Sequence, residues 1–254
     1  MYRFLYIAVC LLCVSSISIA QDSEIPERKF GDPFIILKNE ATGGILIHSG
    51  GFGINVRRGK HVTGFKKRIL DFEFVETKHA KEFKRVSTYI DNGKTYVYGK
   101  LNSAFMLRTG VGNRKIIFSK AERGGVEVNY TFFIGSSLGI IKPVYLDVIY
   151  PSDNPFYKPI RTEKYDPNNK RHIPDNIYGR SGFVKGIDEL GFIPGIYSKF
   201  GFNFDWCGYD EGIKSLEFGI TLDAFTKEIP IMAITDNKQF FLSFYVSIIY
   251  GKKW

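Results

Sequence analysis

Many segments of the chain alternate strictly between apolar and polar positions, and a period of two is typical of β-strands with two different faces. The clearest example is the last alternating segment, 238–250, whose parity continues into the residues after it. Its apolar face consists of Phe240, Leu242, Phe244, Val246, Ile248, Tyr250 and Trp254. Similar alternation recurs through most of the sequence from about residue 33. The pattern therefore predicts an all-β fold.

The alternating segments predict about ten strands. They span 33–39, 43–57, 67–77, 103–112, 114–122, 125–135, 138–150, 191–205, 212–224 and 238–250. Strands of soluble proteins cluster near 5–6 residues, whereas strands that cross a membrane need about 9–11. In lipid, only helices and closed barrels satisfy every backbone hydrogen bond. The long two-faced strands therefore favour a transmembrane antiparallel up-and-down β-barrel of about ten strands, with about 8–12 as the range and a secreted soluble β-sandwich as the alternative.

The predicted connections fall into two groups, because successive connections alternate between the two ends of a barrel. One group is 58–66, 113, 136–137 and 206–211, on the same side as both termini. The other is 40–42, 78–102, 123–124, 151–190 and 225–237. Outer-membrane barrels have short periplasmic turns and longer external loops. We therefore expect residues 33–254 to form a barrel in which 78–102 and 151–190 are the long external loops.

The first twenty residues, MYRFLYIAVCLLCVSSISIA, have the pattern of a secretory signal peptide. Arg3 precedes an apolar core, and Ser18 and Ala20 are small residues before a cleavage site at Gln21. Residues 21–32 then form a polar segment, which we expect in the periplasm. No later apolar run approaches the ~18–20 residues of a membrane-spanning helix. These features predict export to the outer membrane of a Gram-negative cell.

Composition narrows the choice of function class. The 254 residues include 35 Lys and Arg against 26 Asp and Glu, and 16% are aromatic, which excludes a disordered chain. Cys207 is the only cysteine after the predicted signal peptide, which excludes a disulfide scaffold and a cysteine-based metal site. The basic balance suits an anionic partner. In an exported protein we expect that partner to be outer-membrane lipid and lipopolysaccharide rather than nucleic acid.

The second face of the predicted strands carries charged residues. They are Asp71, Glu73, Arg108, Lys115, Glu127, Asp147, Lys199, Glu217 and Asp223, with Arg57 or Arg58 nearby. Buried charges are tolerated when they are paired, and side chains can fill a barrel of 8–10 strands. We therefore expect a structural, salt-bridged charge cluster in the lumen. A ligand or proton path and a pair of catalytic carboxylates are the alternatives.

No group of residues points clearly to catalysis. His48 and Ser49 are adjacent in a predicted strand, so they point to opposite faces and cannot form a nucleophile–base pair within it. The glycine runs GGILIHSGGFG, RTGVG and RGGVEV precede no helix, so they lack the context of a phosphate-binding loop. In a barrel, glycine marks bends, bulges and places where a lumen side chain needs room. We expect a non-enzymatic protein with no cofactor and no metal site.

The predicted strands and signal peptide resemble those of a known group of proteins. Two segments add to this resemblance: YVYGKLNSAFMLRTGVG and GGVEVNYTFFIGSSLGIIKPVYLDVIY. They resemble small outer-membrane barrel proteins of Bacteroidota-type bacteria, over most of the mature chain. The resemblance implies an envelope location and a structural or accessory role in a larger outer-membrane complex, such as secretion or barrel-assembly machinery. It transfers no functional residue. A narrow transport or ligand-binding barrel and a lipid-modifying enzyme stay open as alternatives.

Overall fold

The computed structural model describes residues 38–63, 66–86, 93–120, 125–152, 159–207 and 212–254. The predicted signal peptide (1–20), the predicted periplasmic segment (21–32) and most of the strand predicted at 33–39 lie outside these residues. Within the described ranges, no helix is long and apolar enough to cross a membrane. The secondary structure of these ranges consists of thirteen β-strands.

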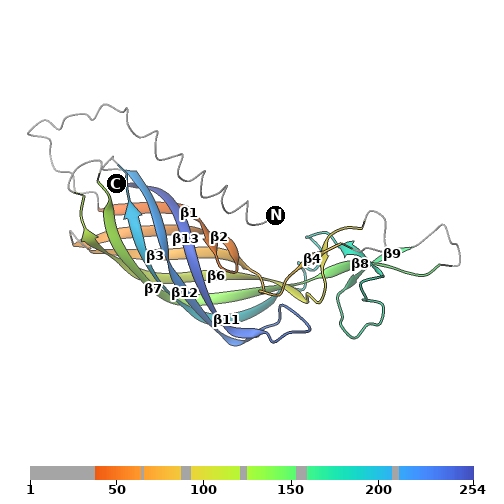
Figure 1. Cartoon of the computed structure of the whole chain (residues 1–254). Helices are drawn as coiled ribbons and strands as arrows, with labels where there is room; N and C mark the ends of the chain where they lie inside the picture. Colours follow the sequence, from red (N-terminus) through yellow and green to blue (C-terminus); the bar gives the residue numbers. More distant parts are fainter. Residues whose placement is uncertain (1–37, 64–65, 87–92, 121–124, 153–158, 208–211) are drawn as a thin grey trace, which may run out of the picture. The chain divides into compact units, whose positions relative to one another are not determined.

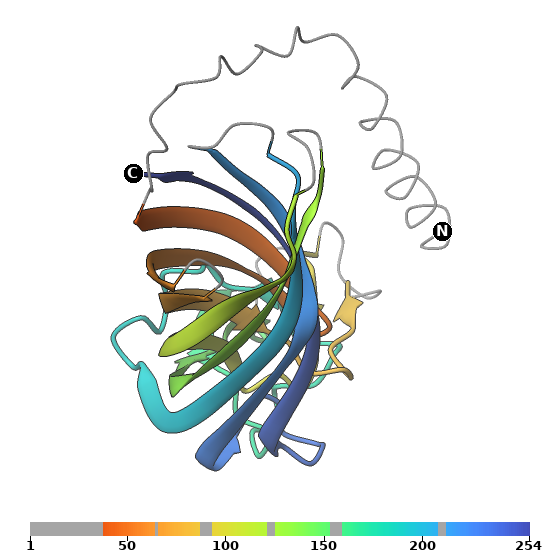
Figure 2. The same ribbon diagram turned by 90° about the vertical axis from the view of Figure 1, so that its left-hand side faces the viewer.

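Eight of the strands form a closed antiparallel barrel (Figures 1 and 2). They are β1 (Asn39–His48), β2 (Gly51–Thr63), β3 (Lys66–Thr77), β6 (Asn102–Phe118), β7 (Glu127–Pro143), β11 (Gly191–Asp205), β12 (Gly212–Ile229) and β13 (Lys238–Lys253). Each pairs with the barrel strands before and after it in the chain, and β1 pairs with β13 to close the ring. The all-β, antiparallel up-and-down barrel is therefore confirmed, with a strand number at the lower limit of the expected range.

The expectation of ten strands was wrong at four places. β1 runs through residues 40–42, where a connection was expected. The segment 43–57 contains a turn at residues 49–50, so it belongs to both β1 and β2. β6 runs without interruption through Asn113, where a connection was expected. β7 likewise continues through residues 136–137 and ends at Pro143, which has no backbone N–H to donate to a strand ladder.

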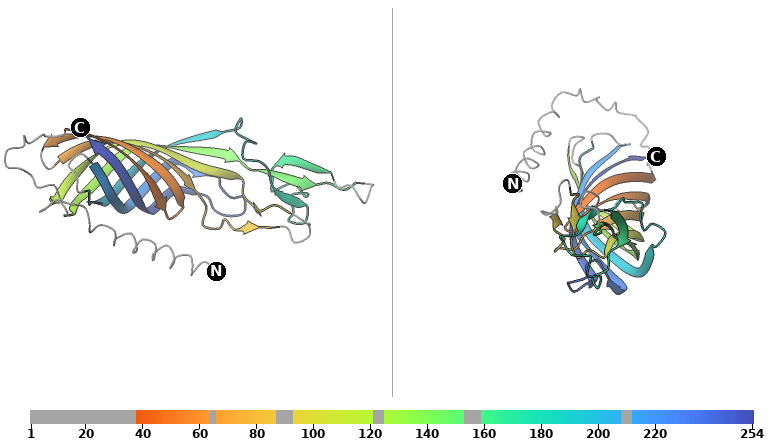
Figure 3. Two further views of the ribbon diagram at one scale, coloured as in Figure 1. Left: turned by 90° about the horizontal axis from the view of Figure 1, so that it is seen from above. Right: turned by 90° about the vertical axis from the view of Figure 1, so that its right-hand side faces the viewer.

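The connections differ in length between the two ends of the barrel. At the end where the C-terminus lies, the connections are 64–65, 119–126 and 206–211. At the opposite end, they are 49–50, 78–101, 144–190 and 230–237. Figure 3 shows the C-terminus at one end and the small sheets of the long connections at the other. The long connections thus lie together, away from the C-terminus. The connection between β6 and β7 is at the C-terminal end, contrary to expectation, and the predicted residues 123–124 lie outside the described residues.

The two long connections contain the remaining five strands. β8 (Tyr145–Ile149), β9 (Ile160–Lys164) and β10 (Ile177–Arg180) form a three-stranded antiparallel sheet in the order β10-β8-β9. β4 (Lys84–Arg85) and β5 (Tyr96–Val97) form a second, two-stranded sheet. A buried apolar cluster includes Tyr96 from one connection and Leu146 and Ile177 from the other. The two connections are therefore packed against each other as folded structure.

The barrel wall carries apolar side chains outside and polar side chains inside. On β13, Phe244 is 67% exposed, whereas Ser247 is fully buried. On β12, Ile220 is 42% exposed and Glu217 is fully buried. The predicted apolar face of the last strand, Phe240, Leu242, Phe244, Val246, Ile248 and Tyr250 with the C-terminal Trp254, is exposed throughout. Soluble proteins show the reverse polarity, because burial of apolar surface stabilises them.

Candidate functional site

The barrel interior holds an apolar cluster toward the end with the long connections. Its buried residues are Leu46, Val75, Ala104, Met106, Ile141, Ile193, Phe225, Ile229, Ile231 and Met232. The last three of these come from the end of β12 and the connection that follows it. Because this connection places buried apolar side chains in the cluster, it covers the interior at this end.

A network of ion pairs occupies the middle of the interior, with Arg57 of β2 at its centre. Arg57 Nε donates to Asp71 Oδ1 at 2.7 Å. Its Nη1 and Nη2 donate to the two carboxylate oxygens of Glu217 at 2.7 and 2.8 Å. The guanidinium also lies 4.9 Å from the centre of the Phe133 ring. Arginine suits this position because its planar fork matches a carboxylate with two parallel hydrogen bonds.

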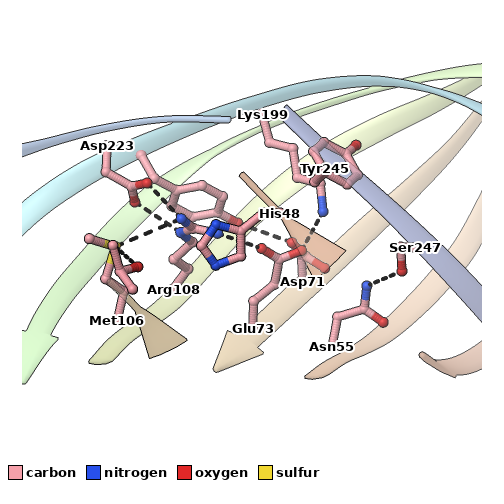
Figure 4. A network of polar contacts seen from close by, with 12 residues as sticks. His48, Asn55, Asp71, Glu73, Met106, Arg108, Lys199, Asp223, Tyr245 and Ser247 are labelled. Carbon is pink, nitrogen blue, oxygen red and sulfur yellow. Dashed lines mark hydrogen bonds and ion pairs between the residues drawn. The ribbon is translucent and has the colours of Figure 1, made fainter. Parts of the chain in front are cut away.

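A second arginine, Arg108 of β6, extends the network. Its Nε and Nη2 donate to the two oxygens of Asp223 at 2.9 and 2.7 Å, and Nη1 donates to Glu73 at 3.3 Å. The amino group of Lys199 donates to the other oxygen of Glu73. Figure 4 shows Arg108, Asp223, Glu73 and Lys199 pointing toward one another from four different strands. The network therefore ties together strands that are far apart in the ring.

Aromatic side chains fill the space around these charges. Tyr245 donates a hydrogen bond to Glu217 Oε1 at 2.9 Å, and Lys199 lies 4.0 Å from the centre of its ring. A β-carbon at Gly201 would lie 2.3 Å from the Tyr245 hydroxyl, so only glycine leaves room for this ring. The predicted run RTGVG shows the same relation, since a β-carbon at Gly112 would lie 2.3 Å from the Phe133 ring.

Each charge of the network is removed from solvent. Three cations face four carboxylates: Arg57, Arg108 and Lys199 with Asp71, Glu73, Glu217 and Asp223, all at most 2% exposed. An unpaired charge in such a place is strongly unfavourable, but each of these groups has at least one oppositely charged partner. The interior is therefore a filled core of ion pairs.

A smaller ion cluster lies nearer the C-terminal end. Glu40 accepts hydrogen bonds from Lys67 at 2.7 Å and from Arg114 Nη1 at 3.2 Å. All three residues are buried. The sequence pattern did not predict this cluster. Glu40 lies in the segment 40–42, which was interpreted as a connection. The break expected at Asn113 assigned Arg114 to the wrong face of its strand.

Six of the nine charges expected in the lumen are there: Asp71, Glu73, Arg108, Lys199, Glu217 and Asp223. Arg57, not Arg58, is the nearby arginine that joins them. Glu127 has the inward parity but lies at the end of β7, where it is partly exposed. Lys115 points outward, because β6 continues through Asn113 without the one-residue shift that was expected. Asp147 lies outside the barrel, on β8.

His48, the one histidine considered as a catalytic base, lies at the end of β1 with both ring nitrogens in contact with backbone groups. Its Nδ1 accepts a hydrogen bond from Gly50 N at 3.2 Å, and its Nε2 lies 3.0 Å from the carbonyl oxygen of Glu76. A neutral imidazole satisfies both contacts, so neither ring nitrogen is free. Across the described ranges, no group of three or more His, Cys, Asp or Glu residues could hold a metal ion.

The three-stranded sheet carries a polar cluster outside the barrel. Two guanidinium groups pack against the ring of Tyr150, that of Arg161 at 4.6 Å and that of Arg171 at 4.5 Å from the ring centre. The Tyr150 hydroxyl and His172 both hydrogen-bond to Glu163, and these contacts hold the pKa of Glu163 below its ordinary value. The sequence predicted no role for these residues, because no motif marks a cluster assembled by strand pairing.

Large apolar side chains are also exposed on the connections, outside the barrel wall. They include Phe83, Val86, Ile160, Ile173, Phe183, Val184, Ile187 and Ile234. Val184, the most exposed of them, is 76% exposed. Phe183 stands edge-on to Phe105 of β6, with ring centres 6.4 Å apart. Residues near Phe183 therefore continue the apolar outer surface of the barrel.

No protein-family model matches the chain, and no curated protein matches it. A similar solved structure is Ail, the attachment invasion locus protein of Yersinia pestis, in complex with the heparin analogue sucrose octasulfate. It is 7% identical, with a TM-score of 0.40, and the match covers 86% of this chain and 100% of that chain. Another is Neisserial surface protein A, 8% identical, with a TM-score of 0.41 and coverage of 85% and 96%.

Scores this low carry no argument about function. The barrel assignment therefore depends on the strand pairing of this chain alone. The expected relation to Bacteroidota-type bacteria gains no support from these comparisons.

Proposed function

We propose that the chain is an exported outer-membrane β-barrel protein that serves as a non-enzymatic structural or accessory subunit of a larger outer-membrane complex. In this proposal the barrel anchors the protein in the membrane, and the folded connections outside the membrane bind the other subunits. One observation carries the proposal: the barrel exposes an apolar wall and buries a filled, paired charge network.

The membrane location is supported by the wall. Monomeric soluble proteins rarely expose contiguous apolar patches larger than a few hundred Å². Here the outward side chains of neighbouring strands are apolar, including Phe72, Phe132, Ile220 and Phe244. The barrel strands are 10–18 residues long, which meets the about 9–11 residues needed to cross the hydrocarbon core. The two longest connections, 78–101 and 144–190, both lie at the end away from the C-terminus, as the external loops of outer-membrane barrels do.

The barrel interior supports the part of the proposal that assigns the protein neither transport nor catalysis. The charged groups that could line a path are paired with one another, and an apolar cluster covers them. His48 has both ring nitrogens engaged. The proposal therefore assigns the charges a structural role.

The role in a complex is supported by the connections. They hold two small sheets with their own apolar core, and they expose Ile160 and Val184. In addition, β9 is at the edge of its sheet, and an edge strand presents unpaired backbone groups to a partner. Contact with membrane lipid and lipopolysaccharide accompanies this role.

The test is purification of the full chain from outer membranes in mild detergent. Unheated and heated gels report the barrel, and mass spectrometry identifies co-purifying proteins. We expect a heat-modifiable band with stoichiometric companions. The variants Ile160→Asp and Val184→Asp should lose the companions and keep the heat-modifiable band. Asn168→Asp, an exposed position in the same connection with the same change of charge, should keep both.

Two outcomes contradict the proposal in different ways. Recovery of the protein only from the soluble fraction contradicts the membrane location. A heat-modifiable band without companions contradicts the subunit role and leaves the barrel in place.

A further inference from the structure

The outer surface of the barrel carries a group of cations at its C-terminal end. They come from three neighbouring strands, β2, β3 and β6, and are Arg58, Lys60, Lys66, Arg68 and Lys115. All five are exposed. On the outward positions of these three strands that the structure describes, the single carboxylate is Glu76, at the other end of β3. We call these five residues the basic face.

The strand register opposes like charges within the basic face. Lys66 of β3 lies directly opposite Lys115 of β6, and Lys60 of β2 lies directly opposite Arg68. Directly opposite side chains have their β-carbons about 4.5–5.5 Å apart, and like charges in such pairs are destabilising. None of the five forms an ion pair with another described residue, whereas the interior cations Arg57, Arg108 and Lys199 all do. The basic face therefore lacks an anion that would relieve this repulsion.

A hollow in the outer surface adjoins this face. Lys66 and Lys115 line it together with Thr63 and Asn113, and the rest of its lining is aromatic: Tyr130, Phe132 and Phe200. Polar groups that can donate hydrogen bonds thus lie next to an apolar surface. A ligand that fits both parts has an anionic head and a hydrocarbon chain.

The basic face occupies one side of the barrel only. On β11, β12 and β13, across the ring, the outward residues at this end are mostly apolar, as in Phe202, Phe204 and Trp206. The described cations there are Lys214 of β12 and Lys252 of β13, against five on the basic face. A ring of cations along a membrane boundary would surround the barrel evenly. The clustering of cations on β2, β3 and β6 instead indicates a local binding site.

We infer that the basic face binds an anionic glycerophospholipid, with its phosphodiester between Lys66 and Lys115 and an acyl chain along Phe132 and Phe200. This inference rests on the proposed membrane location, which puts the C-terminal end at the periplasmic side and hence in the leaflet made of phospholipid. Each lysine near an anionic lipid surface increases the binding constant about fivefold.

The experiment uses native mass spectrometry of the full-length protein in a non-ionic detergent. Dioleoyl phosphatidylglycerol is the probe, and dioleoyl phosphatidylcholine, with the same chains and no net charge, is the reference. We expect the wild type to prefer phosphatidylglycerol. Lys115→Gln should weaken its binding about fivefold, and Lys66→Gln with Lys115→Gln about 30-fold. The matched control Lys214→Gln, outward at the same end, should change it less than about twofold.

Other outcomes overturn the inference. Equal binding of the two lipids, or an equal loss in Lys214→Gln, would show that the basic face has no special affinity. Full competition by millimolar inorganic phosphate would show a free-phosphate site, and stronger binding of lipid A would assign the site to the other leaflet.

A gel-shift assay after insertion into phosphatidylcholine vesicles separates this inference from the proposed function. Failure to insert contradicts the membrane location itself. Insertion with equal lipid binding contradicts the lipid site alone. If the double variant does not insert, the single variant Lys115→Gln decides.

Discussion

Arg57 and Glu217 form a two-bonded ion pair in the barrel interior, with N–O distances of 2.7 and 2.8 Å. The two residues belong to β2 and β12, which are not neighbours in the ring. Their contact therefore links separate parts of the barrel wall through the interior. Each backbone hydrogen bond in the wall joins adjacent strands only, so such interior contacts help to fix which strands face each other across the barrel.

Replacing Arg57 with Met should destabilise the barrel by about 3–5 kcal/mol, because Glu217 would lose its main buried partner. The matched control is Arg58→Met, one residue away on the outer face, which should change the free energy of unfolding by less than about 1 kcal/mol. Urea unfolding in phosphatidylcholine vesicles, followed by the fluorescence of Trp206 and Trp254, measures both. Equal effects of the two substitutions would contradict the assignment of the interior.

Replacing Ile220 with Arg should cost about 2–4 kcal/mol, because the side chain would enter the hydrocarbon region. Ile160→Arg, with similar exposure on β9 outside the barrel, should cost less than about 0.5 kcal/mol. The same vesicle unfolding assay gives the comparison. If both substitutions are tolerated, the barrel wall does not face lipid.

Adding a methyl group at Gly201 should destabilise the barrel by about 1–3 kcal/mol, because the new atom would overlap the Tyr245 hydroxyl. Tyr245→Phe removes that hydroxyl and should recover part of the loss when combined with Gly201→Ala. A double-mutant cycle on the free energy of unfolding measures the coupling between the two residues. Strict additivity would mean that the hydroxyl is not the obstacle.

Acid should loosen the three-stranded sheet before the barrel. The Tyr150 and His172 hydrogen bonds lower the pKa of Glu163 in the folded state. Its contribution to stability is therefore complete above the unfolded pKa of about 4.3 and is lost as the pH falls through the lower folded value. Cleavage by pepsin within β8–β10 should rise across this window.

The variant Glu163→Gln cannot titrate at this position, so its cleavage should depend less on pH. An unchanged pH profile in this variant would show that another group is responsible.

The parts of the fold that follow a strict period of two could be predicted from sequence. On β12 and β13 exposed apolar residues alternate with buried residues, and Glu217, Asp223 and Phe244 lie on the expected sides. The ends of the strands were harder to predict. Gly112 and Asn113 resemble a turn, but glycine at this position instead faces Phe133 across the β6–β7 pair. Sequence cannot distinguish a glycine that turns the chain from one that makes space for a ring.

The positions of the interior charges depended on these strand ends. A one-residue error at Asn113 moved Lys115 to the inside and hid Arg114, because each step along a strand changes the face. Asp147 was misplaced for a related reason, since the alternation of residues 145–149 continues past Pro143 into another sheet. Partners such as Arg57 and Glu217, separated by 160 positions, follow only from the three-dimensional closure of the barrel.

The closure by β1 and β13 also has a consequence for biogenesis. These strands pair from Glu40–Lys253 to His48–Tyr245, so the first strand of the barrel has no partner on one edge until the eighth has been synthesised. Until then the chain carries open strand edges and apolar faces, both of which promote aggregation in water. In the proposed membrane location, the ring would therefore reach the bilayer unfinished and shielded, and its slowest folding step is expected to be the pairing of these two distant strands.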